Sequence, residues 1–161
     1  MGKIISYEEA LNLPRVLYDS NKVDSLPIYK EADENGQCEL FLDTNSNPPT
    51  VDILVKVNDD SLKKDEIGYM ISICSDTIDI WIAYEYKEGY ISSSTNICSG
   101  LPLDTSLNEC INMAKIALST CPVCGKSVPY KEQFGYSFAG RCCEECLPEM
   151  KKKHEYPGWY N

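Results

Sequence analysis

The sequence predicts an α+β protein, an antiparallel β-meander sheet covered by a helix and followed by a small C-terminal zinc module. Segments of alternating apolar residues joined by short turns predict the sheet. An apolar stripe at helical spacing within residues 107–118 predicts the covering helix. The module is predicted by two Cys-x-x-Cys pairs in the last quarter of the chain.

A short helix is expected near the start of the chain. Ser6-Tyr7-Glu8-Glu9 is a capping box, in which Ser6 and Glu9 each bond a backbone N–H that the first helical turn leaves free. The helix should end near Pro14, whose ring removes an N–H and crowds the preceding turn. Residues 18–36 are polar and aperiodic, and they are predicted as a loop with room for one helical turn.

The predicted strands share an alternation of apolar and polar residues. They cover residues 39–43, 51–57, 67–74, 78–86 and 90–94. Within 51–57 the four valine and isoleucine side chains at odd positions fall on one face, so that face should be core. The connections are too short for parallel crossovers, and the strands should therefore pair as an antiparallel meander.

The helix at 107–118 begins at a second capping box, formed by Ser106 and Glu109. Its apolar stripe should cover the sheet, and it consists of Leu107, Ile111, Ala114 and Leu118. No Gly or Ser linker separates this helix from Thr120 and the first cysteine pair. We therefore predict an acidic α+β domain at 1–119 and a zinc-binding module at 120–161 that packs against it.

The two cysteine pairs have the spacing of a structural metal site. Cys121, Cys124, Cys143 and Cys146 would supply four thiolates to one Zn²⁺ per chain and leave no open coordination position. Cys142 is the alternative to Cys143, but only Cys143 repeats the two-residue spacing of the first pair. Two other interpretations stay open, a rubredoxin-like iron site and a thioredoxin-like redox role for the first pair.

The order of features in this segment resembles the treble-clef and zinc-ribbon type zinc fingers. Cys121-Pro122-Val123-Cys124-Gly125 is similar to a zinc knuckle, Ser127 to Arg141 to a hairpin, and the second pair stands where a helix begins. The resemblance covers residues 121–154 only, and no family is identified for residues 1–119. It implies the four cysteine ligands named above. It implies no single function, because such fingers bind nucleic acids, proteins or lipids, or belong to nucleases.

Charge is unevenly distributed along the chain. Residues 1–119 hold 20 Asp and Glu against 9 Lys and Arg, a net charge of −11, and residues 120–161 hold 5 against 6, a net +1. Nucleic-acid affinity depends on clustered cations, so direct binding is disfavoured. With nine cysteines, an odd number, and no apolar signal or membrane-spanning run, we expect a soluble cytoplasmic protein without membrane contacts.

No catalytic constellation is recognisable in the sequence. The single histidine, His154, follows three lysines at an expected helix end, where a solvated side chain is the simpler interpretation. No nucleophile triad, P-loop or dinucleotide fingerprint occurs, and the acidic pairs Asp59-Asp60 and Glu144-Glu145 have no identifiable partner group. We therefore do not expect an enzyme.

The remaining function class is a binding protein. We expect a non-catalytic zinc-binding protein whose acidic domain binds a protein partner with a basic surface, as inhibitor and immunity-type proteins do. Eleven tyrosines and Trp81 are candidate contact residues, and the aromatic tail at 156–160 is either docked or free. The alternatives are action at nucleic acid through Lys126, Lys131, Arg141 and 151–153, or thiol redox chemistry.

Overall fold

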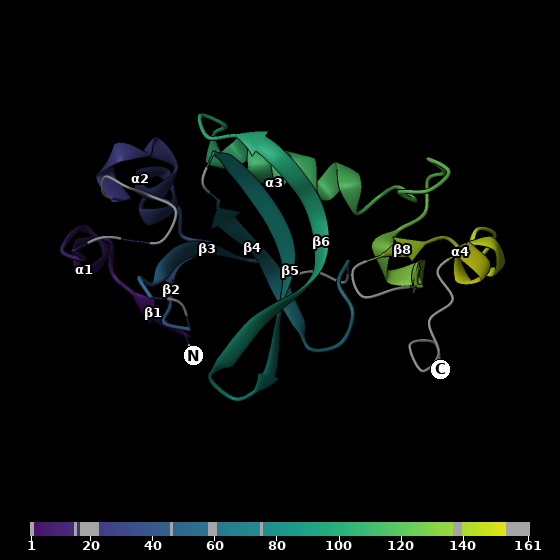
Figure 1. Ribbon diagram of the computed structural model, residues 1–161, viewed down its shortest axis with the longest axis horizontal. Coiled ribbons are helices and arrows are strands. Elements are labelled where there is room, and N and C mark those ends of the chain that lie inside the picture. The colour runs from purple at the N-terminus through teal and green to yellow at the C-terminus, as the bar shows by residue number, and fades with distance from the viewer. Residues whose placement is uncertain are drawn as a thin grey trace.

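A six-stranded antiparallel sheet forms the centre of the computed structural model, which describes residues 2–14, 16, 23–45, 47–57, 61–74, 76–136 and 140–153. Each strand pairs with the next one along the chain (Figure 1), which confirms the predicted antiparallel meander. The strands are β1 Gly2–Ile5, β2 Cys38–Asp43, β3 Thr50–Lys56, β4 Glu66–Ile73, β5 Thr77–Lys87 and β6 Tyr90–Pro102.

The register aligns β-branched side chains across the middle of the sheet. Ile53 pairs with Ile71, Ile71 pairs with Ile80, and all three are fully buried. Such cross-strand pairs on one face are the unit of sheet stabilisation. The alternation seen in the sequence therefore does place one face of the sheet in the main core.

Both edges of the sheet differ from the prediction. The edge strand β1 was not predicted, because Ile5 is its only buried residue and four residues show no clear alternation. At the other edge, β6 extends to Pro102 rather than ending at residue 94. Ile97 is the only buried side chain of β6, so polar residues in this edge strand concealed its length.

The first helices show one correct and one wrong prediction. Helix α1, Tyr7–Leu11, begins at the predicted capping box, with the Glu9 N–H donating to Ser6 Oγ at 3.0 Å. The predicted loop at 18–36 instead contains the 3-10 helix η1, Val23–Ser25, and helix α2, Pro27–Asp33. Proline occupies the first turn of α2, where its missing N–H costs nothing.

Tertiary contacts hold α2 against the sheet. Ile28, Tyr29 and Ala32 are buried in the main core. The Tyr29 hydroxyl donates a 2.7 Å hydrogen bond to the carbonyl oxygen of Val51 in β3. Seven residues are too few for helical periodicity to show in the sequence, so packing rather than pattern defines this helix.

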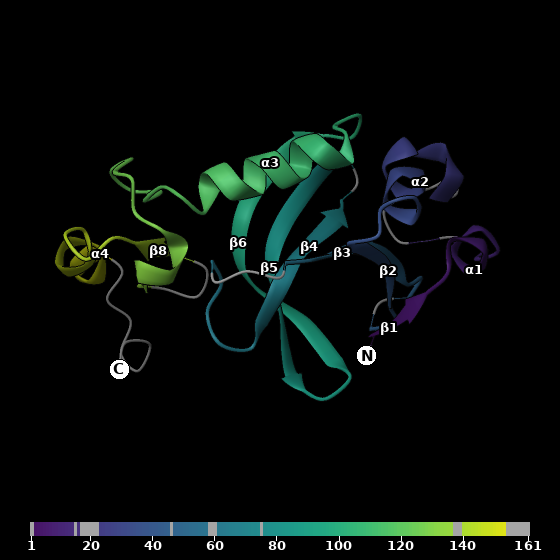
Figure 2. The same cartoon turned by 180° about the vertical axis from the view of Figure 1, so that it is seen from behind.

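Helix α3, Leu107–Ala117, lies across the end of the sheet formed by β5 and β6 (Figures 1 and 2). The Ser106 side chain caps it by accepting a 3.2 Å hydrogen bond from the Glu109 N–H. Leu107, Cys110 and Ala114 are buried in the main core. The predicted covering helix is therefore confirmed, with Cys110 more deeply buried than the expected Ile111.

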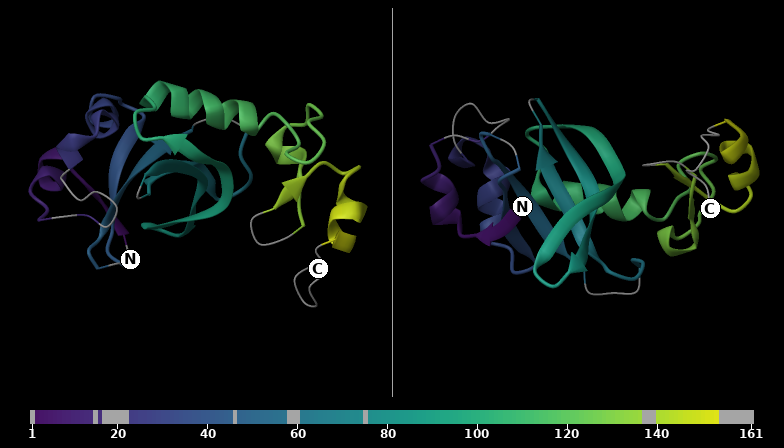
Figure 3. Two further views of the ribbon diagram at one scale, coloured as in Figure 1. Left: turned by 45° about the horizontal axis from the view of Figure 1, so that its top comes forward. Right: turned by 60° about the horizontal axis from the view of Figure 1, so that its bottom comes forward.

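The second face of the sheet has a smaller core of its own, formed by Phe41, Leu54, Met70 and Ala83. Trp81 is half-buried against it. Strands β5 and β6 bend strongly along their length (Figure 3), and their pairing contains several register shifts of the kind that bulges produce. The bend lets the sheet enclose part of its second face.

The C-terminal segment lies beyond the end of α3 (Figure 2). It contains the 3-10 helix η2, Tyr130–Glu132, strands β7, Phe134–Gly135, and β8, Arg141–Cys142, and helix α4, Leu147–Lys153. Cys142 and Met150 belong to a small separate core, whereas Tyr130 belongs to the main one. A division into two domains after residue 119 stays a prediction.

Candidate metal centre

The first cysteine pair lies in a tight turn directly after α3. The Cys121 N–H donates to the Lys126 carbonyl at 2.8 Å, and the Gly125 N–H donates to the Cys121 carbonyl at 2.9 Å. Gly125 has φ of 78°, a conformation in which a side chain would be strained. The turn therefore holds Cys121 and Cys124 on the same side of the loop.

The second pair joins β8 to α4. Cys143 follows β8, which pairs with β7, and the Cys146 N–H donates to the Cys143 carbonyl at 3.1 Å. Cys146 immediately precedes α4, and its carbonyl accepts a 3.0 Å hydrogen bond from the Met150 N–H. The end of β8 thus positions the Cys143 thiol, and the start of α4 positions the Cys146 thiol.

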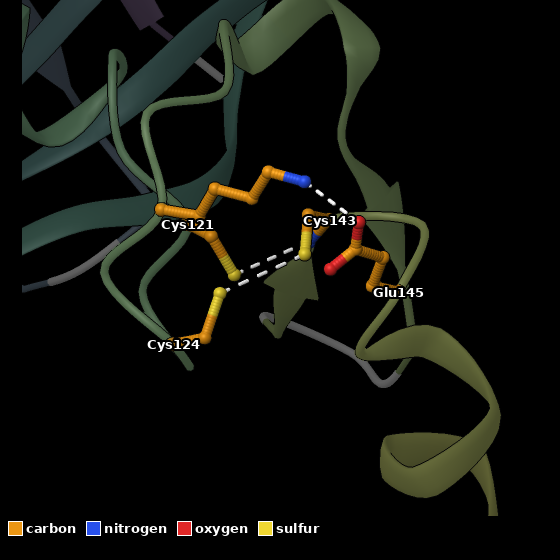
Figure 4. Close-up of polar contacts among 5 residues, drawn as sticks. Cys121, Cys124, Cys143 and Glu145 are labelled. Atoms are coloured by element: carbon orange, nitrogen blue, oxygen red, sulfur yellow. Dashed lines mark hydrogen bonds and ion pairs between the residues drawn. The ribbon is translucent and has the colours of Figure 1, made fainter.

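The four predicted cysteines come together in space. The Sγ atoms of Cys121, Cys124, Cys143 and Cys146 all lie within 4.8 Å of one another. Cys124 Sγ and Cys143 Sγ are 3.8 Å apart, and the Cys143 N–H donates to Cys121 Sγ at 3.3 Å (Figure 4). Cys142 is fully buried in the small core and is not part of this cluster.

The donor set and spacing fit a tetrahedral metal ion. Four zinc–sulfur bonds of about 2.3 Å place neighbouring sulfur atoms about 3.8 Å apart. The Cys124–Cys143 separation of 3.8 Å has this value. Four thiols at such distances cannot all ionise without a cation between them, because like charges repel. The cluster is therefore compatible with binding of a soft divalent ion such as zinc.

The local electrostatics already favour one thiolate. Burial alone would raise the pKa of Cys121, but hydrogen bonds from the backbone N–H groups of Cys124, Cys143 and Val123 lower it to about 6. Burial and hydrogen bonds with the other three thiols raise the pKa of Cys146. Without a metal, Cys121 is therefore the thiolate and Cys146 keeps its proton, and metal binding would release that proton.

An ion pair links the two loops that carry the cysteines. Lys126 Nζ lies 2.7 Å from Glu145 Oε1 (Figure 4), with both side chains more than half exposed. The predicted acidic pair Glu144-Glu145 is thus exposed, and Glu145 has a structural partner. Exposed ion pairs contribute little to stability, so this contact orients the loops more than it holds them.

Four further cysteines do not join the centre. Cys38, Cys74, Cys98 and Cys110 lie outside the cluster, and burial raises the pKa of each of them. They behave as small apolar side chains rather than as nucleophiles. His154, Asp59, Asp60 and the aromatic tail at 156–160 lie outside the described residues.

One unusual carboxylate was missed by sequence reasoning. Asp52 lines a cavity of about 110 Å³ on the second face of the sheet, together with Asp43 and the rings of Tyr86 and Tyr90. Burial and the charge of Asp43 raise the pKa of Asp52 to about 7, although a hydrogen bond with Ser72 acts in the opposite direction. In the sequence, Asp52 reads as a polar residue on the solvent-facing side of a strand, so its burial could not be predicted.

Taken together, the fold and the site define an α+β protein with a four-cysteine cluster arranged for a metal ion. No protein-family model, curated protein or solved structure matches the chain. Among the helices of the described residues, none is long and apolar enough to cross a membrane.

Proposed function

We propose that the four cysteines bind one Zn²⁺ as the structural centre of a treble-clef-like module. The observation that carries this proposal is the approach of all four Sγ atoms to within 4.8 Å of one another. The order of elements also supports it, with a knuckle followed by the β7–β8 hairpin and then α4. Four protein ligands complete a tetrahedral shell, so such a centre would hold the module folded and would not activate a substrate.

Zinc stoichiometry tests this proposal. Chain purified under reducing conditions should contain one zinc by elemental analysis, and Cys143→Ala should lose it. Cys142→Ala is the matched control, because Cys142 is the neighbouring buried cysteine outside the cluster. Cys124→Ser should also expose residues 120–153 to proteolysis, since the binding free energy of zinc is folding free energy for so small a module.

A thiol redox role is the second candidate, favoured by the 3.8 Å contact between Cys124 Sγ and Cys143 Sγ and by the lowered pKa of Cys121. The two candidates give opposite results in one experiment. A redox protein would contain no zinc and would form a reversible disulfide under mild oxidation. A zinc protein would protect all four thiols from alkylation until a chelator is added.

We further propose that the acidic part of the chain binds a basic protein surface and that the whole is a non-catalytic binding protein. Support comes from the net charge of −11 over residues 1–119 and from one concentrated surface. A groove of about 470 Å³ separates the end of α2 from the start of α3. Glu31 and Glu34 line this groove. The exposed Asp33 and Glu109 are next to its lining residues in the sequence, and we call these four residues the α2–α3 acidic groove.

The groove suits a cationic ligand because three of its four carboxylates are exposed, while Glu31 is half-buried and accepts a 3.3 Å hydrogen bond from the Leu107 N–H. Asp33, Glu34 and Glu109 are exposed, and Lys30 lies 4.0 Å from Glu34 in an exposed ion pair. Other residues are less suited to contact a partner. Trp81 is half-buried, and Glu66 is hydrogen-bonded to Tyr130. Arg141, which belongs to the alternative nucleic-acid patch, is buried.

Binding of octalysine, measured by fluorescence anisotropy, tests the groove. The double reversal Asp33→Lys with Glu34→Lys should weaken binding at least several-fold at low salt. The matched control, Asp65→Lys with Glu85→Lys, makes the same change in net charge at two other exposed residues. Equal weakening by both pairs would show that net charge alone attracts the peptide, and the groove would then have no specific role.

A further inference from the structure

Arg141 connects the metal module to the rest of the fold from a buried position. Only 6% of its surface is exposed. Its Nη1 donates to the Asn96 carbonyl of β6 at 3.0 Å, and its Nη2 donates to the Ala117 carbonyl at the end of α3 at 3.1 Å. The guanidinium carbon lies 5.9 Å from the centre of the Tyr130 ring. One side chain thus contacts a strand, a helix and η2.

The charge of Arg141 has no carboxylate partner among the described residues. Both hydrogen-bond acceptors are neutral carbonyls, and Nε has no hydrogen-bond partner. A guanidinium stays protonated in proteins, so this is a buried and uncompensated cation. Such a charge is strongly unfavourable unless a counter-charge lies nearby.

The metal centre would provide that counter-charge. A divalent ion bound by four thiolates carries an overall charge of −2. Arg141 stands two residues before Cys143 in the sequence. Burial lowers the pKa of its guanidinium, and the negative charges of ionised Tyr130, Cys98 and Cys121 act in the opposite direction. The other cation at the centre, Lys126, is exposed and already paired with Glu145. The excess negative charge therefore has Arg141 as its buried partner.

We propose that Arg141 is a positioning residue that couples metal occupancy to docking of the C-terminal module on β6 and α3. Its charge balances the loaded centre, while its two carbonyl contacts hold the module against the sheet. This inference rests on the proposed zinc function. Because coupling between binding equilibria is reciprocal, zinc must strengthen docking by the factor by which docked Arg141 strengthens zinc binding.

Two measurements on the full chain test the coupling. Zinc affinity is obtained by competition with a chelator, and hydrogen exchange is followed in residues 94–98 and 114–118 with and without zinc. In the natural chain, removing zinc should accelerate exchange in both segments. Arg141→Gln should still bind one zinc at saturation, with affinity about 10-fold or more weaker, and exchange in both segments should no longer respond to zinc.

Two further variants separate charge from contact geometry. Arg141→Lys keeps the charge without the two-pronged contact, so its zinc affinity should stay closer to that of the natural chain while both segments exchange faster. Lys131→Gln removes an exposed cation of the same segment that has no part in the cysteine loops, and it should change neither measurement. If Arg141→Gln does not fold, Arg141→Lys still tests the proposal. A loss of zinc affinity in Arg141→Lys as large as its loss of protection from exchange would contradict the role of the charge.

The outcomes distinguish this inference from the proposal on which it rests. A chain that binds no zinc would overturn both. Zinc binding with unchanged affinity in Arg141→Gln would overturn the coupling alone. Faster exchange by the same factor with and without zinc would show that Arg141 has a purely structural role, and this too would overturn the coupling.

Discussion

The hydroxyl of Tyr130 donates a 2.7 Å hydrogen bond to Oε2 of Glu66, joining η2 to the first residue of β4. The other carboxylate oxygen of Glu66 accepts a 2.7 Å hydrogen bond from the Lys63 N–H. Lys63 Nζ in turn donates to the Gln133 carbonyl at 3.0 Å and lies 4.8 Å from the centre of the Tyr130 ring. A closed network of side chains thus connects the segment before β4 to the segment before β7.

Tyr130→Phe should destabilise the protein by about 1–2 kcal/mol, because it removes a partly buried hydrogen bond to a charged group and leaves one Glu66 oxygen without that donor. Chemical denaturation followed by circular dichroism measures the loss. Tyr86→Phe is the matched control, since the Tyr86 side chain is 62% exposed. An equal effect of the two substitutions would mean that the Tyr130 hydroxyl does not strengthen the junction.

Gly68→Ala should cost at least ~2 kcal/mol of stability. A methyl group at Gly68 would stand 1.8 Å from the backbone oxygen of Val55, and the residue lies at a register shift between β4 and β5. Backbone on the neighbouring strand can move only by breaking sheet pairing, so the clash is not relieved cheaply. Gly36→Ala is the control, because nothing lies within 4 Å of its added methyl group. Similar denaturation midpoints for both would contradict the close approach.

The cavity at Asp52 predicts an unusual pH dependence. Its pKa is raised in the fold from the ordinary 3.8 to about 7, so between these values the unfolded chain ionises first and stability falls as pH rises. Below about pH 4 both states are protonated, and above about pH 7 the loss is complete. Asp52→Asn should therefore gain stability relative to the natural chain as pH increases, by roughly 1–3 kcal/mol at pH 8.

Denaturation curves at pH 5, 6, 7 and 8 for both proteins measure this difference. Asp33→Asn, at an exposed position outside the cavity, is the control. A constant difference between Asp52→Asn and the natural chain over the whole range would show that Asp52 does not titrate within it.

The strongest repeating patterns in the sequence predicted the fold correctly. Alternation over residues 51–57 and 78–86 gave two central strands, because both have one face in the main core. Ser106 gave the start of α3, because capping is a local interaction. The cysteine pairs indicated which thiols meet, and the structure brings them together with Cys143 rather than Cys142.

What the sequence did not reveal depends on contacts between distant residues. Helix α2 is held by burial of Ile28 and Tyr29 against β3 rather than by its own periodicity. The sequence suggested that Arg141 belongs to an exposed basic patch, whereas the structure buries it. Its burial could not be predicted because its two hydrogen-bond acceptors lie 45 and 24 positions away in the sequence. The raised pKa of Asp52 depends likewise on the bend of β5 and β6 over the second face.

The acidic groove leads to a prediction about binding rates. Long-range attraction raises the rate of encounter, whereas contacts at short range determine how long a complex lasts. The double variant Asp33→Lys with Glu34→Lys should therefore slow association of labelled octalysine more than it speeds dissociation. The effect should fade above roughly 0.15 M salt, where screening acts over about 8 Å.

Stopped-flow fluorescence at several salt concentrations separates the two rates. The control pair, Asp65→Lys with Glu85→Lys, alters the net charge equally and should slow association less, because those residues lie outside the groove. Tyr86→Ala, which removes an exposed ring without changing charge, should leave association unchanged. Association rates that respond neither to salt nor to these reversals would leave solubility as the better explanation of the net charge of −11 over residues 1–119.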